Sequence, residues 1–195
     1  VIRDLSEFSP EQIAAEVARL QSIYTLSKPA LLDDFVIRGR RLLANWTNVS
    51  LDDLTLRNSV LNERVEQLND MVSSFCDENN LPQLTVRVDE SLRPGQAVIE
   101  NGTLLIHPDS LLFPNERDLF DGLYHELTHN EQLFLIVRQL RSELGPNATV
   151  NQIRQAYETA TDRSDDLSVE YVTEALNIIN QRELEPLTQT QSRAA

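Results

Sequence analysis

The sequence predicts an α+β fold in which a small β-sheet lies between two groups of helices. Apolar residues recur at helical spacing over about residues 9–79, alternate as in strands over about 82–113, and return to helical spacing over about 115–183. The chain has 195 residues, of which 41% are apolar. This length allows a single well-packed core without disulfides or structural metals.

The first part is predicted to contain three helices. Ser9-Pro10 is typical of a helix start, and apolar residues follow it at helical spacing. A second helix is predicted over 29–46, and a third over 50–79, where the sequence Ser50-Leu51-Asp52-Asp53 resembles a capping box. We expect residues 1–80 to form a helical arm that docks a substrate, binds a protein partner or acts as a prodomain.

The middle part changes to the period of β-strands. Residues 84–88 alternate between apolar and polar side chains. Residues 97–100 and 103–107 flank Asn101-Gly102, the dipeptide that most strongly indicates a two-residue hairpin turn. The sequence therefore predicts one strand followed by a β-hairpin.

The last part returns to helices. We predict a long helix from Asn115 or Pro114 to the Gly145-Pro146 stop, a shorter one over 149–160, and a last one over 164–179. Residues 81–183 would form the functional core. Residues 184–195 are polar and without a period, so we expect a flexible tail there.

Composition excludes several classes of function. The 17 basic and 31 acidic residues give a formal charge of −14, which disfavours binding to nucleic acids and to anionic membranes. Cys76 is the single cysteine, so neither an internal disulfide nor a CxxC metal or redox site is possible, and we expect it to be a buried core residue. No apolar run approaches the length of about 18 residues that a membrane span needs.

One motif carries chemistry. His125-Glu126-Leu127-Thr128-His129 has the form HExxH and lies inside the predicted long helix. Residues four apart share one helical face, so both imidazoles can reach one Zn²⁺. Zinc lowers the pKa of a coordinated water to about 7, and Glu126 is placed to take its proton as general base. The alternative is a solvated polar helix face with no metal.

This helix after a small sheet resembles the zincin metallopeptidases. The resemblance implies a Zn²⁺-dependent hydrolase of protein or peptide substrates, in which an edge strand beside the active-site helix binds the substrate by strand addition. We expect Thr103–Ile106 to be that edge strand. Gln132 and Leu135 replace the Gly and His of the metzincin pattern, so that subgroup is excluded.

The third metal ligand is expected from a glutamate further along the chain. Residues 170–174 resemble the gluzincin pattern, in which a ligand Glu is followed four residues later by an acid. The resemblance implies that Glu170 binds zinc and that Glu174 accepts a hydrogen bond from a ligand histidine. This chain has Glu at the second position, where Asp is commoner. Glu174 and Glu158 remain alternatives as the ligand.

A second resemblance covers about residues 95–135. The sequence His125–Gln132 has the form HELxHxxQ and follows the predicted hairpin. This is similar to a peptidase-like domain of bacterial toxin and contractile-injection loci, which is often part of longer polypeptides. The chain begins at Val1, which fits a processed form or a piece of a longer protein.

Three questions stay open at this level. Oxyanion stabilisation requires a further donor, for which the candidates are Tyr157, Tyr171, His107 and Arg163. The compartment is undefined, although four Asn-x-Ser/Thr sequences leave a secreted origin open. The alternative to a peptidase is a non-catalytic zinc-containing interaction or assembly module of a larger protein or toxin system, with partners bound by the N-terminal helices.

Overall fold

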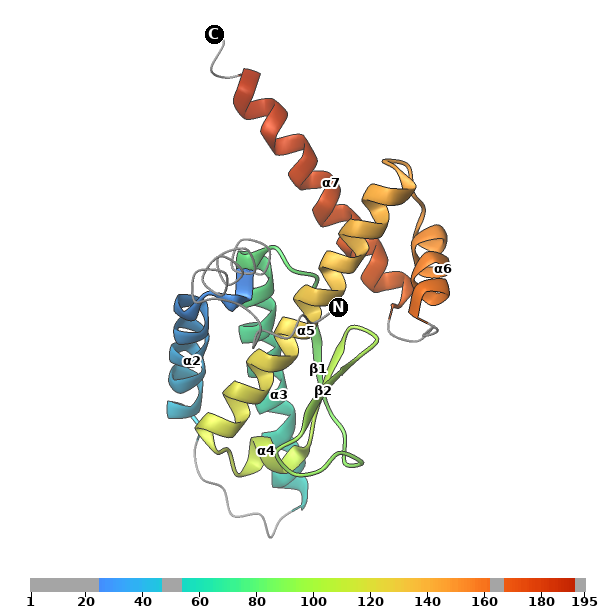
Figure 1. Ribbon diagram of the computed structural model, residues 1–195. Helices are drawn as coiled ribbons and strands as arrows, with labels where there is room; N and C mark the ends of the chain where they lie inside the picture. Colours follow the sequence, from blue (N-terminus) through green and yellow to red (C-terminus); the bar gives the residue numbers. More distant parts are fainter. Residues whose placement is uncertain (1–24, 47–53, 162–166, 192–195) are drawn as a thin grey trace, which may run out of the picture.

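The computed structural model describes residues 25–46, 54–161 and 167–191. It confirms the α+β class, with a three-stranded sheet between N-terminal and C-terminal helices (Figure 1). The helix predicted to follow Ser9 lies outside the described residues. In chain order the elements are η2 (Thr25–Ser27), α2 (Pro29–Ala44), α3 (Leu54–Asn79), β1 (Thr85–Val88), β2 (Ala97–Glu100), β3 (Thr103–Ile106), α4 (Pro108–Leu112), α5 (Glu116–Leu144), α6 (Val150–Thr161) and α7 (Val169–Gln191).

The sheet has the order β1-β3-β2. β3 pairs in parallel with β1 and antiparallel with β2. The expectation that Thr103–Ile106 is an edge strand is therefore wrong, because β3 is the central strand. Its partner across the hairpin, β2, forms the edge instead. The sequence could not show this, since the parallel pairing of β1 joins segments that are distant along the chain.

The hairpin turn forms as predicted from Asn101-Gly102. Both residues have positive φ, 51° and 74°, as the central positions of a type I′ turn require. The other edge of the sheet is closed by a side chain of α3. The Asn69 amide accepts a hydrogen bond from Val86 N at 2.6 Å and donates one to Val86 O at 3.1 Å. The middle of β1 is therefore unable to take a further strand, whereas β2 faces α5.

One hydrophobic core joins the N-terminal helices to the rest of the molecule. The Phe35 ring of α2 lies 5.0 Å from the Phe75 ring of α3 and 6.2 Å from the Phe120 ring of α5, both in edge-to-face geometry. Tyr124 of α5 completes this cluster. Residues from both sides of position 80 share this core. The expected division into a helical arm, 1–80, and a functional core, 81–183, therefore remains a prediction about function.

Gly39 allows α2 to approach α5 closely, and its replacement has a testable cost. A Cβ at Gly39 would overlap the buried Phe120 ring, whereas a Cβ at Gly122 of α5 would meet no atom within 4 Å. Gly39→Ala should destabilise the protein by about 1–2 kcal/mol, since overpacking outweighs the gain in helix propensity. Gly122→Ala, the matched control, should stabilise it by up to about 1 kcal/mol. Urea unfolding of both variants checks the prediction, and a stabilised Gly39→Ala would contradict the packing.

The helices otherwise differ from the prediction mainly at their ends. α7 continues to Gln191, so most of the segment expected to be a loose tail is helical; its Glu, Leu and Gln residues are good helix formers. A short helix, α4, follows β3 and was not predicted. His107 caps it, with Nδ1 accepting a hydrogen bond from Asp109 N at 3.1 Å.

Candidate metal centre

Helix α5 carries the motif and orients it. The Asn115 side chain caps the helix by accepting from the amides of Arg117 and Asp118, as its sequence predicts. Leu123 and Leu127 are fully buried on the core side of the helix. His125, Glu126 and His129 take the remaining faces, where His125 is exposed and the other two side chains are half-buried. The 3.6-residue period thus turns the motif away from the core and toward the sheet edge.

His125, Glu126 and His129 converge. Each offers a ligand atom, and these atoms lie within 4.8 Å of one another; they are the one such group of His, Cys, Asp or Glu in the described part of the chain. The two Nε2 atoms of the histidines are 3.0 Å apart. Two nitrogens bound at about 2.0–2.1 Å to a tetrahedral Zn²⁺ would lie about 3.3 Å apart. The donor set and its spacing therefore fit a metal ion with little movement.

The Glu126 carboxylate faces the edge strand. Its Oε2 accepts a hydrogen bond from Ile99 N at 3.1 Å. His107 N donates to Gln96 O, and the alternation that follows directs the main-chain groups of Val98 and Glu100 toward β3. Ala97 and Ile99 therefore turn their main-chain groups outward. Among the described residues no further strand pairs with this side of β2, and it runs past the carboxylate that the sequence assigns as general base.

A further side chain on α5 contacts His129. Gln132 Oε1 lies 3.1 Å from His129 Nδ1, while His129 Nε2 faces His125. Gln132 stands three residues after His129, and this spacing puts both on one helical face. The sequence contains this signal in its HELxHxxQ pattern, but the pattern alone assigns no role to the glutamine.

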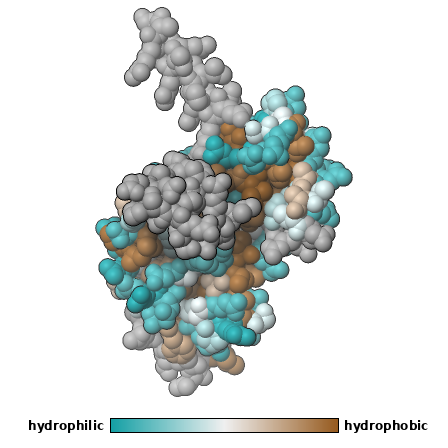
Figure 2. Space-filling model, in the orientation of Figure 1, coloured by the Kyte–Doolittle hydropathy of each residue, from teal (hydrophilic) through white to brown (hydrophobic). Residues whose placement is uncertain are grey.

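A pocket of about 380 Å³ opens at the metal-binding group. Its polar wall includes Glu126 and His129, and it continues along α5 toward apolar side chains. Ile99, Asn101, Gln132, Leu133, Ile136 and Tyr157 complete the lining. On the face shown in Figure 2, hydrophobic surface follows the C-terminal half of α5 and the part of α7 that crosses it. The sequence did not predict that Ile99, Leu133 and Ile136 line the site, because apolar side chains at regular spacing indicate only a helix or strand face.

The two candidate tyrosines occupy different places. Both rings are buried, and Tyr157 of α6 lines the pocket. Tyr171 of α7 is buried, its hydroxyl donates to Asn130 O at 2.9 Å, and burial raises its pKa well above the usual value. Of the other candidates, His107 caps α4, and Arg163 lies outside the described residues. Tyr157 is thus the candidate whose position favours contact with a bound ligand.

The three candidate glutamates lie outside the group of three. Glu158 and Glu170 are exposed on α6 and at the start of α7. Glu174 Oε1 accepts a hydrogen bond from Gln83 N at 2.8 Å, at the approach to β1. In this conformation the HExxH residues are therefore held without a carboxylate from a later helix.

Two neighbours of the motif are structural. Asn130 donates to Pro82 O at 2.8 Å, and the buried Glu131 carboxylate accepts from Thr25 N at 2.5 Å and Leu26 N at 2.9 Å. These contacts fasten α5 to the strand approach and to η2. Cys76 is fully buried, as expected, and burial raises the pKa of its thiol to about 12; it lies outside the metal-binding group.

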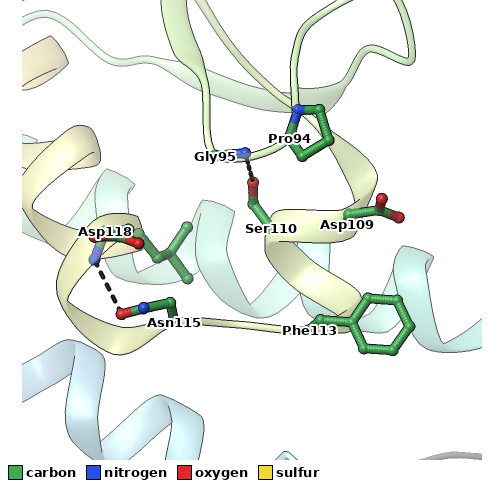
Figure 3. Close-up of a pocket in the computed structure, with 8 residues that line it drawn as sticks. Pro94, Gly95, Asp109, Ser110, Phe113, Asn115 and Asp118 are labelled. Carbon is green, nitrogen blue, oxygen red and sulfur yellow. Dashed lines mark hydrogen bonds between the residues drawn. The ribbon is translucent and has the colours of Figure 1, made fainter.

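A second pocket of about 380 Å³ lies where the start of α5 meets α4 and the turn before β2 (Figure 3). Ser110 Oγ accepts a hydrogen bond from Gly95 N, and Asn115 accepts one from Asp118 N. Both contacts are turn and cap interactions that a stable fold needs. None of the described residues that line this pocket belongs to a metal-binding group.

No helix in the described ranges is both long and apolar enough to cross a membrane. The part of the chain that the structure describes is mostly helical and contains a group of side chains that can hold a metal ion. Comparisons of the chain with protein-family models, with curated proteins and with solved structures give no match.

Proposed function

We propose that the chain is a zinc-dependent metallopeptidase. The observation that carries this proposal is the convergence of both histidine Nε2 atoms and the Glu126 carboxylate beside the edge strand β2. Imidazole nitrogens suit Zn²⁺, and an acid next to them suits proton transfer. The zincin resemblance of the sequence supports the same assignment.

The roles of the chain's own residues follow from their positions. His125 and His129 would hold the metal, which acts as a Lewis acid and lowers the pKa of water to about 7. Glu126 takes a proton from the water that attacks the peptide carbonyl carbon. As the C–N bond breaks, Glu126 delivers that proton to the leaving amine. Tyr157, at the pocket wall, is the proposed donor to the oxyanion.

The substrate would bind as an extended segment along β2. Ala97 and Ile99 present outward main-chain groups there, and strand addition uses such groups for affinity. A substrate carbonyl that accepts from Ile99 N takes the place of Glu126 Oε2, which is then free for the water. Substrate binding at the edge strand would in this way release the general base for its reaction with water.

Metal analysis of the full chain is the first test. After loading with zinc and dialysis, wild type should hold about one zinc per chain, and His129→Ala should hold none. His107→Ala is the matched control, because His107 caps α4 and belongs to no metal-binding group; it should keep its zinc. If wild type holds no zinc after loading with excess metal, the motif is a polar helix face and the proposal fails.

Glu170 remains the proposed third protein ligand, on the resemblance to gluzincins. The same assay with Glu170→Gln, Glu174→Gln and Glu158→Gln compares the alternatives. The ligand is the glutamate whose replacement lowers zinc affinity. Equal affinity in all three variants would mean that water or substrate completes the coordination.

A further inference from the structure

We infer that Gln132 is the positioning residue of this metal centre: its side-chain oxygen holds His129 in the tautomer that leaves Nε2 free to bind the metal. The inference rests on the proposed function for its metal. It assigns to Gln132 the part that the resemblance to gluzincins gives to Glu174.

The hydrogen-bond chemistry of the contact defines the tautomer. An amide oxygen only accepts, so the 3.1 Å contact with Gln132 Oε1 requires that His129 Nδ1 carries the hydrogen. In the neutral ring, Nε2 then has a free lone pair. That lone pair faces His125 Nε2 at 3.0 Å, where a bound cation would lie. Ligand histidines in metal sites are commonly held by such a partner on their other nitrogen.

Glu174 is engaged elsewhere. Its carboxylate accepts from Gln83 N, and it lies on α7, outside the HExxH group. Gln132 instead belongs to the same helix as the histidine that it contacts, three residues further on. Because both residues lie on one helix, the geometry of their contact does not depend on the position of α7. The orienting partner is therefore local in this chain rather than supplied by a later helix.

Zinc affinity measured by competition with a chelator tests the role in the full-length protein. Gln132→Leu removes the acceptor and should weaken zinc binding by about 10–100-fold. Gln132→Glu keeps an acceptor at the same place and should bind zinc at least as tightly as wild type. Gln139→Leu is the matched control, because Gln139 is exposed on α5 and contacts Glu143, not the metal group. It should leave the affinity unchanged.

A second measurement needs no metal. Nitrogen-15 NMR of the metal-free protein reports which ring nitrogen of His129 is protonated. We expect Nδ1–H in wild type and in Gln132→Glu, and a shift toward Nε2–H in Gln132→Leu. Wild-type His129 with Nε2–H, or an unchanged affinity in Gln132→Leu, would overturn the inference. A wild type that binds no zinc but shows the Nδ1–H tautomer would instead overturn the proposed function and leave the contact intact.

Discussion

Replacing Glu126 by glutamine should lower the rate of peptide hydrolysis by about 10²–10⁴-fold and leave zinc bound. Glutamine retains the shape of the side chain and can still accept from Ile99 N, but it cannot take a proton from water at neutral pH. General-base catalysis contributes about 10²–10⁴-fold, and we expect a loss of that size in kcat. Cleavage of quenched fluorescent peptides, with metal content measured on the same samples, checks the prediction.

Two outcomes of that experiment carry different meanings. If Glu126→Gln cleaves peptides as fast as wild type, the base lies elsewhere and the mechanism is wrong. If wild type holds zinc but cleaves no peptide, the non-catalytic interaction module becomes the better interpretation of the chain. His107→Ala serves again as a control, since it removes a histidine that caps α4 and lies outside the metal-binding group, and it should retain activity.

Replacing Phe35 by alanine should cause the largest loss of stability, about 3–5 kcal/mol. Phe35 is fully buried, and its ring contacts those of Phe75, Phe120 and Tyr124. The loss is large beside the total stability of about 5–15 kcal/mol that is typical of single domains. Urea unfolding followed by circular dichroism measures it.

The matched control is Phe113→Ala, because the Phe113 side chain is 64% exposed. It should change the free energy of unfolding by no more than about 0.5 kcal/mol. In Phe35→Ala we expect a single cooperative transition that moves as a whole, since the N-terminal helices and the metal-binding helix share one core. Two separate transitions, of which only one moves, would show that residues before 80 fold as an independent unit.

The elements of the fold were largely predictable from the sequence because local signals are strong in this chain. Asn101-Gly102 predicts the hairpin turn, Asn115 the start of α5, and Gly145 its end, and the structure has all three. The HExxH spacing likewise predicts that two histidines and a glutamate meet, because a single helix fixes their separation. Such features depend on neighbours within a few residues.

The sequence by itself determined the α+β class and the convergence of His125, Glu126 and His129. The tertiary structure alone decided what surrounds them. It made β2 rather than β3 the edge strand, placed Ile99 N on Glu126, lined the pocket with Tyr157, and bonded the Tyr171 hydroxyl to Asn130 O. The physical reason is that strand order and interhelix packing join segments far apart in the chain, and no local periodicity encodes which of them meet.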